Sequence, residues 1–211
     1  MKRAQVTPER PGWLAKLPDP WDEKVLSAAF DAFAAKGFDG ASMAEIATLA
    51  GVSKRTVYER YKDKAHLFRA LLAWGCRGNL PLEPPSTDLD AEEALVRQAE
   101  AVLAAMMRPE SIDLARIVIA ATPRFPELGA LFDDMTRTAS LRIVKALARR
   151  LARDGRIATA NADQVAADFI GLLRGDAYYR ALLGVAPVLP QPKVKVEARR
   201  AVKTLLAAYG G

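Results

Sequence analysis

The chain has 211 residues, of which 51% are hydrophobic and 27% charged, and its formal net charge at pH 7 is +6. This length is sufficient for one large domain or two small ones with a well-buried core. Ala and Leu dominate the apolar residues and β-branched residues rarely cluster, which favours an all-helical protein. The modest positive excess fits a nucleic-acid partner without requiring one.

Cysteine and histidine are too rare in this sequence for several kinds of site. Cys76 is the single cysteine and His66 the single histidine, so an internal disulfide is excluded and a metal site built from His and Cys is not expected. Paired-carboxylate and phosphate-loop motifs are also absent from the sequence, so we expect no enzyme activity, no cofactor and no metal. The composition fits the reducing cytoplasm, and no apolar stretch reaches the about 18 residues of a membrane span.

Residues 1 to 20 are expected to form a flexible arm. Four prolines interrupt this segment and no apolar run gives it a core or a signal-peptide pattern. Lys2, Arg3 and Arg10 are candidate contacts for nucleic-acid phosphates or a minor groove, and the alternative is a tail without a partner.

The first helix is expected to begin near Trp21. Its apolar face is carried by Val25, Ala29 and Phe33, which recur at i, i+4 and i+8. Gly37 is expected to end it, because glycine readily takes the left-handed conformation found at helix C-termini.

Residues 42 to 61, SMAEIATLAGVSKRTVYERY, predict two short helices separated by a tight turn. Ser42 and Glu45 form an S-x-x-E capping box at the start of the first helix, and Gly51 ends it. The apolar side of that helix comprises Ile46, Leu49 and Ala50. Ser53 caps the second helix, about residues 54 to 60, and a turn of three residues between them suits a helix-turn-helix.

The second of these helices begins a strongly basic stretch. From Ser53 to Lys64 the chain has five cations and two acids, a local balance of +3, on a surface that also carries hydroxyl groups. Val57 and Tyr61 lie four residues apart and are expected to face inward. A basic surface on the second helix of a helix-turn-helix indicates contact with DNA.

The rest of the chain also has helical periodicity. A helix is expected from Asp63, whose carboxylate can cap it, to about Gly78, and prolines between residues 80 and 90 mark a boundary. Further helices are expected over residues 95–106, 112–121, 128–154, 161–184 and 194–209. The prediction is an all-α fold of about nine helices, with an arm at residues 1–20, a DNA-binding head at 21–79 and a body at 80–211.

Residues 22 to 74 resemble the TetR family of bacterial transcriptional regulators. The matching run is VLSAAFDAFAAKGFDGAS followed by MAEIATLAGVSKRTVYERYKDKAHLFRAL, and ATPRFPELGALFDD is similar to the corresponding region of multidrug-efflux-type members. The resemblance implies a three-helix head and a body that binds an effector and pairs two copies. Tyr61 departs from the family, in which Phe is commonest at this position, and its hydroxyl could reach a phosphate.

The helix-turn-helix geometry and the resemblance together predict the DNA contacts. The second helix lies in the major groove with its N-terminal residues at base edges, while cations and helix starts hold phosphates. A core aromatic is the alternative for Tyr58, and a salt bridge with Glu59 or Asp63 is the alternative for Arg60. The predicted DNA-binding residues are Ser42, Ser53, Lys54, Arg55, Thr56, Tyr58, Arg60, Tyr61 and Lys64.

One head offers few base contacts, so a homodimer on a pseudo-palindromic operator is expected, with half-sites about 10 base pairs or a multiple apart. The last two long helices are the predicted interface. Its candidate residues are Gly171, Gly175, Val202 and Leu205. The two glycines form a small-x-x-x-small pair on one helix face that would let backbones approach closely; the alternative is packing inside one subunit.

The body is expected to enclose a pocket for a small apolar or amphipathic effector. The candidate lining residues are Met106, Met107, Arg116, Phe125, Phe132, Phe169, Leu173 and Arg174. The alternative for most of them is plain core. The leading hypothesis is a repressor released from DNA by that effector, and the alternative is a helix-turn-helix regulator controlled by a protein partner.

Overall fold

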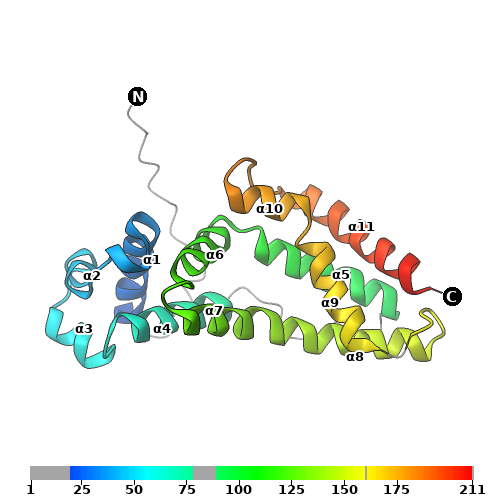
Figure 1. Cartoon of the computed structure of the whole chain (residues 1–211), viewed down its shortest axis with the longest axis horizontal. Coiled ribbons are helices and arrows are strands. Elements are labelled where there is room, and N and C mark those ends of the chain that lie inside the picture. The colour runs from blue at the N-terminus through cyan, green and yellow to red at the C-terminus, as the bar shows by residue number, and fades with distance from the viewer. Residues whose placement is uncertain (1–19, 78–88, 160, 211) are drawn as a thin grey trace. The chain divides into compact units, whose positions relative to one another are not determined.

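The computed structural model describes residues 20–77, 89–159 and 161–210, and its regular elements are all helices (Figure 1). No strand occurs in these three ranges, which confirms the all-α prediction. The cations of the predicted arm and the prolines near residue 80 lie outside the described residues. Within the described parts, no helix is both long and apolar enough to span a membrane.

The chain divides into two compact units that do not follow the sequence order. The first comprises Met1–Gly78 and Arg116–Phe132, and the second Asn79–Ala115 and Asp133–Gly211. The first unit therefore contains, besides residues of the predicted head, a segment that the sequence assigns to the body.

The first unit is built on four helices, with part of α6 (Pro109–Ala121) and most of α7 (Pro126–Asp133). The four are α1 (Pro20–Gly40), α2 (Met43–Ala50), α3 (Lys54–Arg60) and α4 (Lys64–Arg77). α1 packs against both α2 and α4. The fully buried side chains of this unit are large and apolar, and they include Phe30, Phe33, Ile46, Leu67 and Phe68. Burying this apolar surface holds the short helices together, because helices of seven or eight residues are not stable alone.

Gly37 interrupts α1 where the sequence predicts its end. Its φ is +71°, in the left-handed region, and the helix resumes for one short piece to Gly40 beyond this kink. Phe38 follows the kink and is buried, with its ring centroid 5.6 Å from that of Phe33 and 5.3 Å from that of Phe68.

The predicted caps of α2 and α3 are present. The Ser42 hydroxyl accepts a hydrogen bond from the Glu45 amide at 3.2 Å, and the Ser53 hydroxyl accepts one from the Thr56 amide at 3.1 Å. The Glu45 carboxylate, expected to complete the capping box, lies 2.6 Å from the Lys36 ammonium. Gly51 ends α2 with a φ of +66°.

The prediction for Leu49 is wrong. Its side chain is 58% exposed, although the helical period places it beside Ile46. α2 is short, and its buried side is made by Met43, Ile46 and Ala47.

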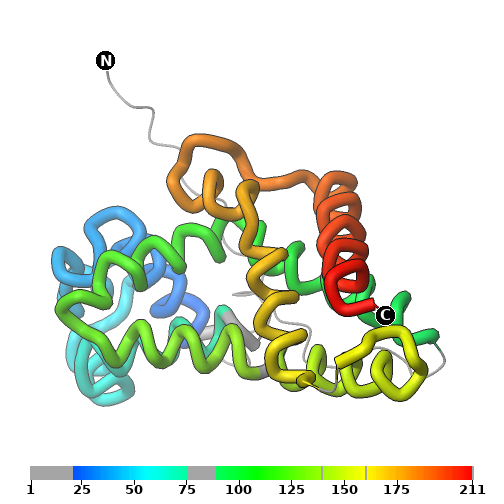
Figure 2. The backbone as a smooth tube through the Cα atoms, turned by 45° about the vertical axis from the view of Figure 1, so that its right-hand side comes forward, coloured from blue at the N-terminus to red at the C-terminus, as the bar shows by residue number. Residues whose placement is uncertain are grey.

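The second unit is a helical layer of its own. Its helices are α5 (Ala91–Met106), the π-helical segment η2 (Asp134–Thr138), α8 (Ala139–Arg153), α9 (Ala162–Leu173), α10 (Asp176–Leu183) and α11 (Gln191–Tyr209). α11 lies beside α5 and α9, and α9 also packs against α8 (Figure 2). The core between them contains Leu95, Val144, Phe169 and Val194.

Two predicted long helices differ from the observed ones. Residues 128–154 form α7, η2 and α8 in succession, so the helical path continues but changes its hydrogen-bonding register. The helix predicted from residue 161 to 184 divides into α9 and α10 at Arg174 and Gly175. A Cβ at position 175 would lie 3.2 Å from the Leu172 carbonyl oxygen, so a glycine permits this tight break. Gly171 and Gly175 are therefore not on one helix face.

Candidate DNA-binding surface

α3 exposes most of its side chains. Val57 is its buried residue, while Lys54, Arg55, Thr56 and Tyr58 are exposed; these four form what we call the recognition face. Tyr58 is 51% exposed, so the core-aromatic alternative does not describe it. The face offers two cations, a hydroxyl with a methyl group and a phenol, which suit phosphates and base edges.

Local contacts hold the start of this face. The Ser53 and Thr56 hydroxyl oxygens are 2.7 Å apart, in addition to the bond between the Thr56 amide and the Ser53 hydroxyl. Arg55 Nε donates to a Glu59 carboxylate oxygen at 2.7 Å, one helical turn further on. Both partners of this ion pair are exposed, so its contribution to stability is small.

Arg60 and Tyr61 turn away from the recognition face. Arg60 Nε donates to Asp22 Oδ1 at 2.9 Å, its Nη2 donates to Asp22 Oδ2, and the Tyr61 hydroxyl donates to Asp22 Oδ1 at 2.7 Å. Tyr61 is buried, as its spacing from Val57 predicts. The hydrogen bond to Asp22 raises the pKa of Arg60. The salt-bridge alternative for Arg60 named Glu59 or Asp63, whereas the ion pair described above joins Arg60 to Asp22, 38 positions earlier.

Lys64 is partly buried beneath the loop between α1 and α2. Its ammonium donates to the carbonyl oxygens of Asp39 at 3.1 Å and Ala41 at 3.0 Å, and lies 4.7 Å from the centroid of the Phe38 ring. Burial lowers the pKa of Lys64, and the Asp39 charge opposes this. The cation predicted to hold a phosphate thus holds the loop that leads into Ser42. Ser42 itself is exposed at the start of α2.

The segment between α6 and α7 touches the same loop. Arg124 Nη1 donates to Asp39 Oδ2 at 2.7 Å, and the rings of Phe125 and Phe38 are 4.8 Å apart in an edge-to-face arrangement. Phe125 was predicted to line an effector pocket, and here its ring packs on the head. Nothing in the local sequence pattern indicates this contact, because it joins positions about 85 residues apart.

The match to family models decides the identity of the chain. Residues 25–71 match the model of bacterial regulatory proteins of the tetR family, and residues 93–211 match the model of the C-terminal domain of AefR-like transcriptional repressors. The chain belongs to the TetR family. The recognition face thus lies on the second helix of a TetR-family helix-turn-helix.

Two curated TetR-type relatives share part of the sequence. The chain is 32% identical over 98 residues to the HTH-type transcriptional regulator SrpR of Pseudomonas putida, a match that covers 46% of this chain and 45% of SrpR. It is also 32% identical over 98 residues to TtgW, an uncharacterized HTH-type transcriptional regulator of the same species, a match that covers 46% of this chain and 71% of TtgW. The matched stretch therefore spans less than half the length of SrpR.

Solved structures resemble most of the chain. A protein assigned to the TetR family from Mesorhizobium loti is 28% identical with a TM-score of 0.74, covering 94% of this chain and 98% of its own. The flavonoid-responsive regulator FrrA is 28% identical with a TM-score of 0.72, covering 89% of this chain and 96% of its own.

The residues predicted for a TetR-type effector pocket lie in different environments. Met107, Phe169 and Leu173 are buried in the core of the second unit, as the plain-core alternative expects. Met106 packs at the edge of that core, and Arg174 is exposed. Arg116 and Phe132 belong, with Phe125, to the first unit. The predicted pocket stays a prediction.

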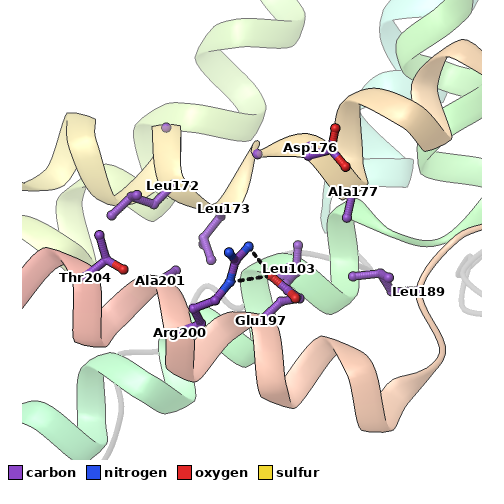
Figure 3. Close-up of a pocket in the computed structure, with 12 residues that line it drawn as sticks. Leu103, Leu172, Leu173, Asp176, Ala177, Leu189, Glu197, Arg200, Ala201 and Thr204 are labelled. Atoms are coloured by element: carbon purple, nitrogen blue, oxygen red, sulfur yellow. Dashed lines mark hydrogen bonds and ion pairs between the residues drawn. The ribbon is translucent and has the colours of Figure 1, made fainter.

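The second unit has a cavity of about 320 Å³ between α5, α9, α10 and α11 (Figure 3). Leucines line part of it, and Arg200 and Glu197, one turn apart on α11, form an ion pair on its wall with an Nε–Oε2 distance of 2.9 Å. Gly171 and Gly175, predicted for the dimer interface, line this cavity and are exposed. Val202 and Leu205, predicted for the same interface, are instead buried within the unit.

Proposed function

We propose that the protein is a repressor that binds a pseudo-palindromic operator as a homodimer and is released by a small apolar or amphipathic effector. The observation that carries the DNA-binding part is the exposure of the recognition face on a helix that buries Val57 alone. Lys54, Arg55, Thr56 and Tyr58 are all solvent-exposed, and none of the four is buried in the core of the head. Contact with DNA gives these side chains a function.

Each member of the recognition face suits a distinct contact. Arg55 can bind guanine O6 and N7 with two hydrogen bonds, and the Thr56 methyl can meet a thymine methyl. Lys54 suits a phosphate, which adds affinity without sequence information. Two such faces are needed for useful specificity, which is why the proposal includes a homodimer and an operator with twofold symmetry.

Selection of bound sequences from a random DNA pool tests this proposal. The wild-type protein should enrich a pseudo-palindrome with half-sites about one helical turn (~10 base pairs) or a multiple apart. On that operator Thr56→Ala and Tyr58→Ala should each lose about 1–3 kcal/mol of binding and relax the sequence preference. Lys24→Ala removes an exposed cation from α1 and is the control for sequence preference, which it should leave unchanged because loss of a cation alters affinity for all sequences alike. Unchanged affinity and preference in both variants would show that α3 does not read the operator.

The effector part of the proposal is supported by the AefR-like C-terminal match and by one structural relative. FrrA, 28% identical, is described as flavonoid-responsive. An aromatic, largely apolar small molecule of that type is therefore the first probe for this chain. Because coupling between two sites is reciprocal, the effector and the operator should weaken each other's binding equally, typically by about 1–3 kcal/mol.

Titration of a flavonoid panel into the protein–operator complex tests the effector. Release of DNA, measured by fluorescence anisotropy, should occur with at least one compound that also binds the free protein. If none binds or releases the operator, while a bacterial protein partner does, the regulator is controlled by that protein.

A further inference from the structure

Asp22 is a buried acid in a basic head, and no prediction from the sequence gave it a role. Its side chain is 8% exposed and lies in the first turn of α1. Three donors converge on the carboxylate: Nε and Nη2 of Arg60 and the hydroxyl of Tyr61. Arg60 is the last residue of α3 and Tyr61 is its C-cap, so this carboxylate connects α1 to the end of α3.

The contact between the Arg60 guanidinium and the Asp22 carboxylate fixes the orientation of both side chains. Two parallel hydrogen bonds between a guanidinium and a carboxylate hold both groups in one plane, which a single contact does not. The Tyr61 hydroxyl binds the same oxygen as Arg60 Nε. A buried carboxylate is costly without partners, so each of these donors contributes to the stability of the cluster.

Trp21 closes the cluster on its other side. Its ring is stacked on that of Tyr61, with centroids 6.3 Å apart and an angle of 12° between the planes. The guanidinium carbon of Arg60 is 5.6 Å from the centroid of the Trp21 ring. Trp21 and Asp22 of α1 therefore both contact Arg60 and Tyr61 at the end of α3.

α3 needs an external support of this kind. It has seven residues, too few for an independent helix, and Val57 is its buried side chain. Its N-terminal end is held by the Ser53 cap and the turn at Gly51. The contact with Asp22 holds the other end, so the angle of the recognition face depends on both.

We propose that Asp22 is a positioning residue for operator recognition, which acts through Arg60 and Tyr61 to set the angle of the recognition face. This inference rests on the proposed function, in which α3 reads DNA. It also reassigns Arg60 and Tyr61, predicted as DNA contacts, as the two side chains through which Asp22 acts.

If Asp22 acted through its charge alone, its removal would have the opposite effect on DNA binding. An acid close to a DNA-binding surface repels phosphates, so its removal should strengthen binding to every sequence. A positioning role requires that removal weakens binding to the operator relative to unrelated DNA. The ratio of the two dissociation constants therefore separates the two roles.

The test measures dissociation constants of Asp22→Asn for the selected operator and for an unrelated duplex at one salt concentration. Glu23→Gln, which changes the charge by the same amount at the next residue of α1, is the matched control. We expect Asp22→Asn to lower the ratio of specific to non-specific affinity at least tenfold, and Glu23→Gln to leave it within twofold. An unchanged ratio in Asp22→Asn, or an equal change in both variants, overturns the proposal.

Milder variants keep the test valid if Asp22→Asn folds poorly. Tyr61→Phe keeps the stacking on Trp21 and removes one hydrogen bond, and Arg60→Lys keeps the charge and loses the two-bond geometry. Each should lower the ratio about threefold to tenfold, with circular dichroism confirming a folded head. If both variants keep the wild-type ratio of specific to non-specific affinity, the positioning role of Asp22 is also overturned. If wild-type protein selects no sequence from the pool, the proposed function itself fails, and this outcome is distinct from an unchanged ratio on a selected operator.

Discussion

Tyr61 combines a stacked ring with a hydroxyl that donates to a buried carboxylate. Burial and the Asp22 carboxylate raise the pKa of Tyr61 above its ordinary value of 10.0. A raised pKa means that the folded head keeps the phenol protonated after the unfolded chain has begun to ionise. The stability that this bond contributes is therefore complete below about pH 10 and is lost as the pH rises further.

Tyr61→Phe tests this linkage between protonation and stability. At pH 7 the variant should lose about 1 kcal/mol of unfolding free energy, because Asp22 loses one of its donors. The difference in unfolding free energy between the variant and the wild-type protein should become smaller as the pH rises above about 10, because the phenol then ionises in the unfolded wild-type chain. Urea unfolding at pH 7, 9 and 10.5 measures both quantities. Parallel pH profiles for the two proteins would contradict the buried hydrogen bond.

Lys64 gives a second prediction at this scale, because its ammonium binds two backbone carbonyl oxygens. Lys64→Met keeps an unbranched apolar side chain and removes these bonds together with the ammonium over the Phe38 ring. It should lower the unfolding free energy by about 1–2 kcal/mol. A cation that only held a phosphate would behave differently: its loss would leave stability unchanged and reduce the salt dependence of DNA binding by about one unit. Urea unfolding and a salt titration of binding distinguish the two roles.

The turn between α2 and α3 depends on one glycine. Gly51 has a φ of +66°, and a Cβ built on it meets nothing within 4 Å. Gly51→Ala should therefore destabilise the head by about 1–2 kcal/mol through backbone conformation alone. Thermal unfolding of Gly51→Ala against the wild-type protein measures this loss, and an unchanged unfolding midpoint would show that the turn does not depend on the left-handed backbone at position 51.

Local signals predict the elements of the head well. Ser42, Ser53 and Gly51 act within three or four residues of their own positions, so their roles in caps and turns follow from spacing. Contacts between distant residues are not encoded in this way. The sequence pattern predicts that Arg60 contacts DNA or a neighbouring acid, because the pattern contains no information that Asp22 lies beside it. The sequence pattern also does not predict the break at Gly175, because the apolar spacing continues through it.

At the scale of the whole molecule, the exposed side of α9 and α11 is the part of the second unit best suited to pair two copies. Gly171 and Leu172 from α9 and Arg200 and Thr204 from α11 are exposed and line the same cavity. Val202 and Leu205 contribute indirectly, because they lie on the buried side of α11 and so leave its opposite side exposed. We propose this surface as the homodimer interface, with the cavity covered by the partner.

Gly171 allows a direct test of that interface. Its Cβ would enter open space in the monomer, so Gly171→Arg should leave the helical content and the fold of each unit unchanged. In a closely packed interface of two helices from each copy, the same side chain would meet the partner and its charge would lose water. The variant should weaken dimerisation at least about tenfold, equivalent to about 1.4 kcal/mol or more.

Ala146→Arg is the control: it places the same side chain on the exposed side of α8 and should sediment like the wild-type protein at micromolar concentration. Gly171→Arg should also weaken operator binding, and Ala146→Arg should not. The reason is that dimerisation supplies the effective concentration with which the second head binds its half of the palindrome. A Gly171→Arg protein that remains dimeric would place the interface on another surface of the molecule.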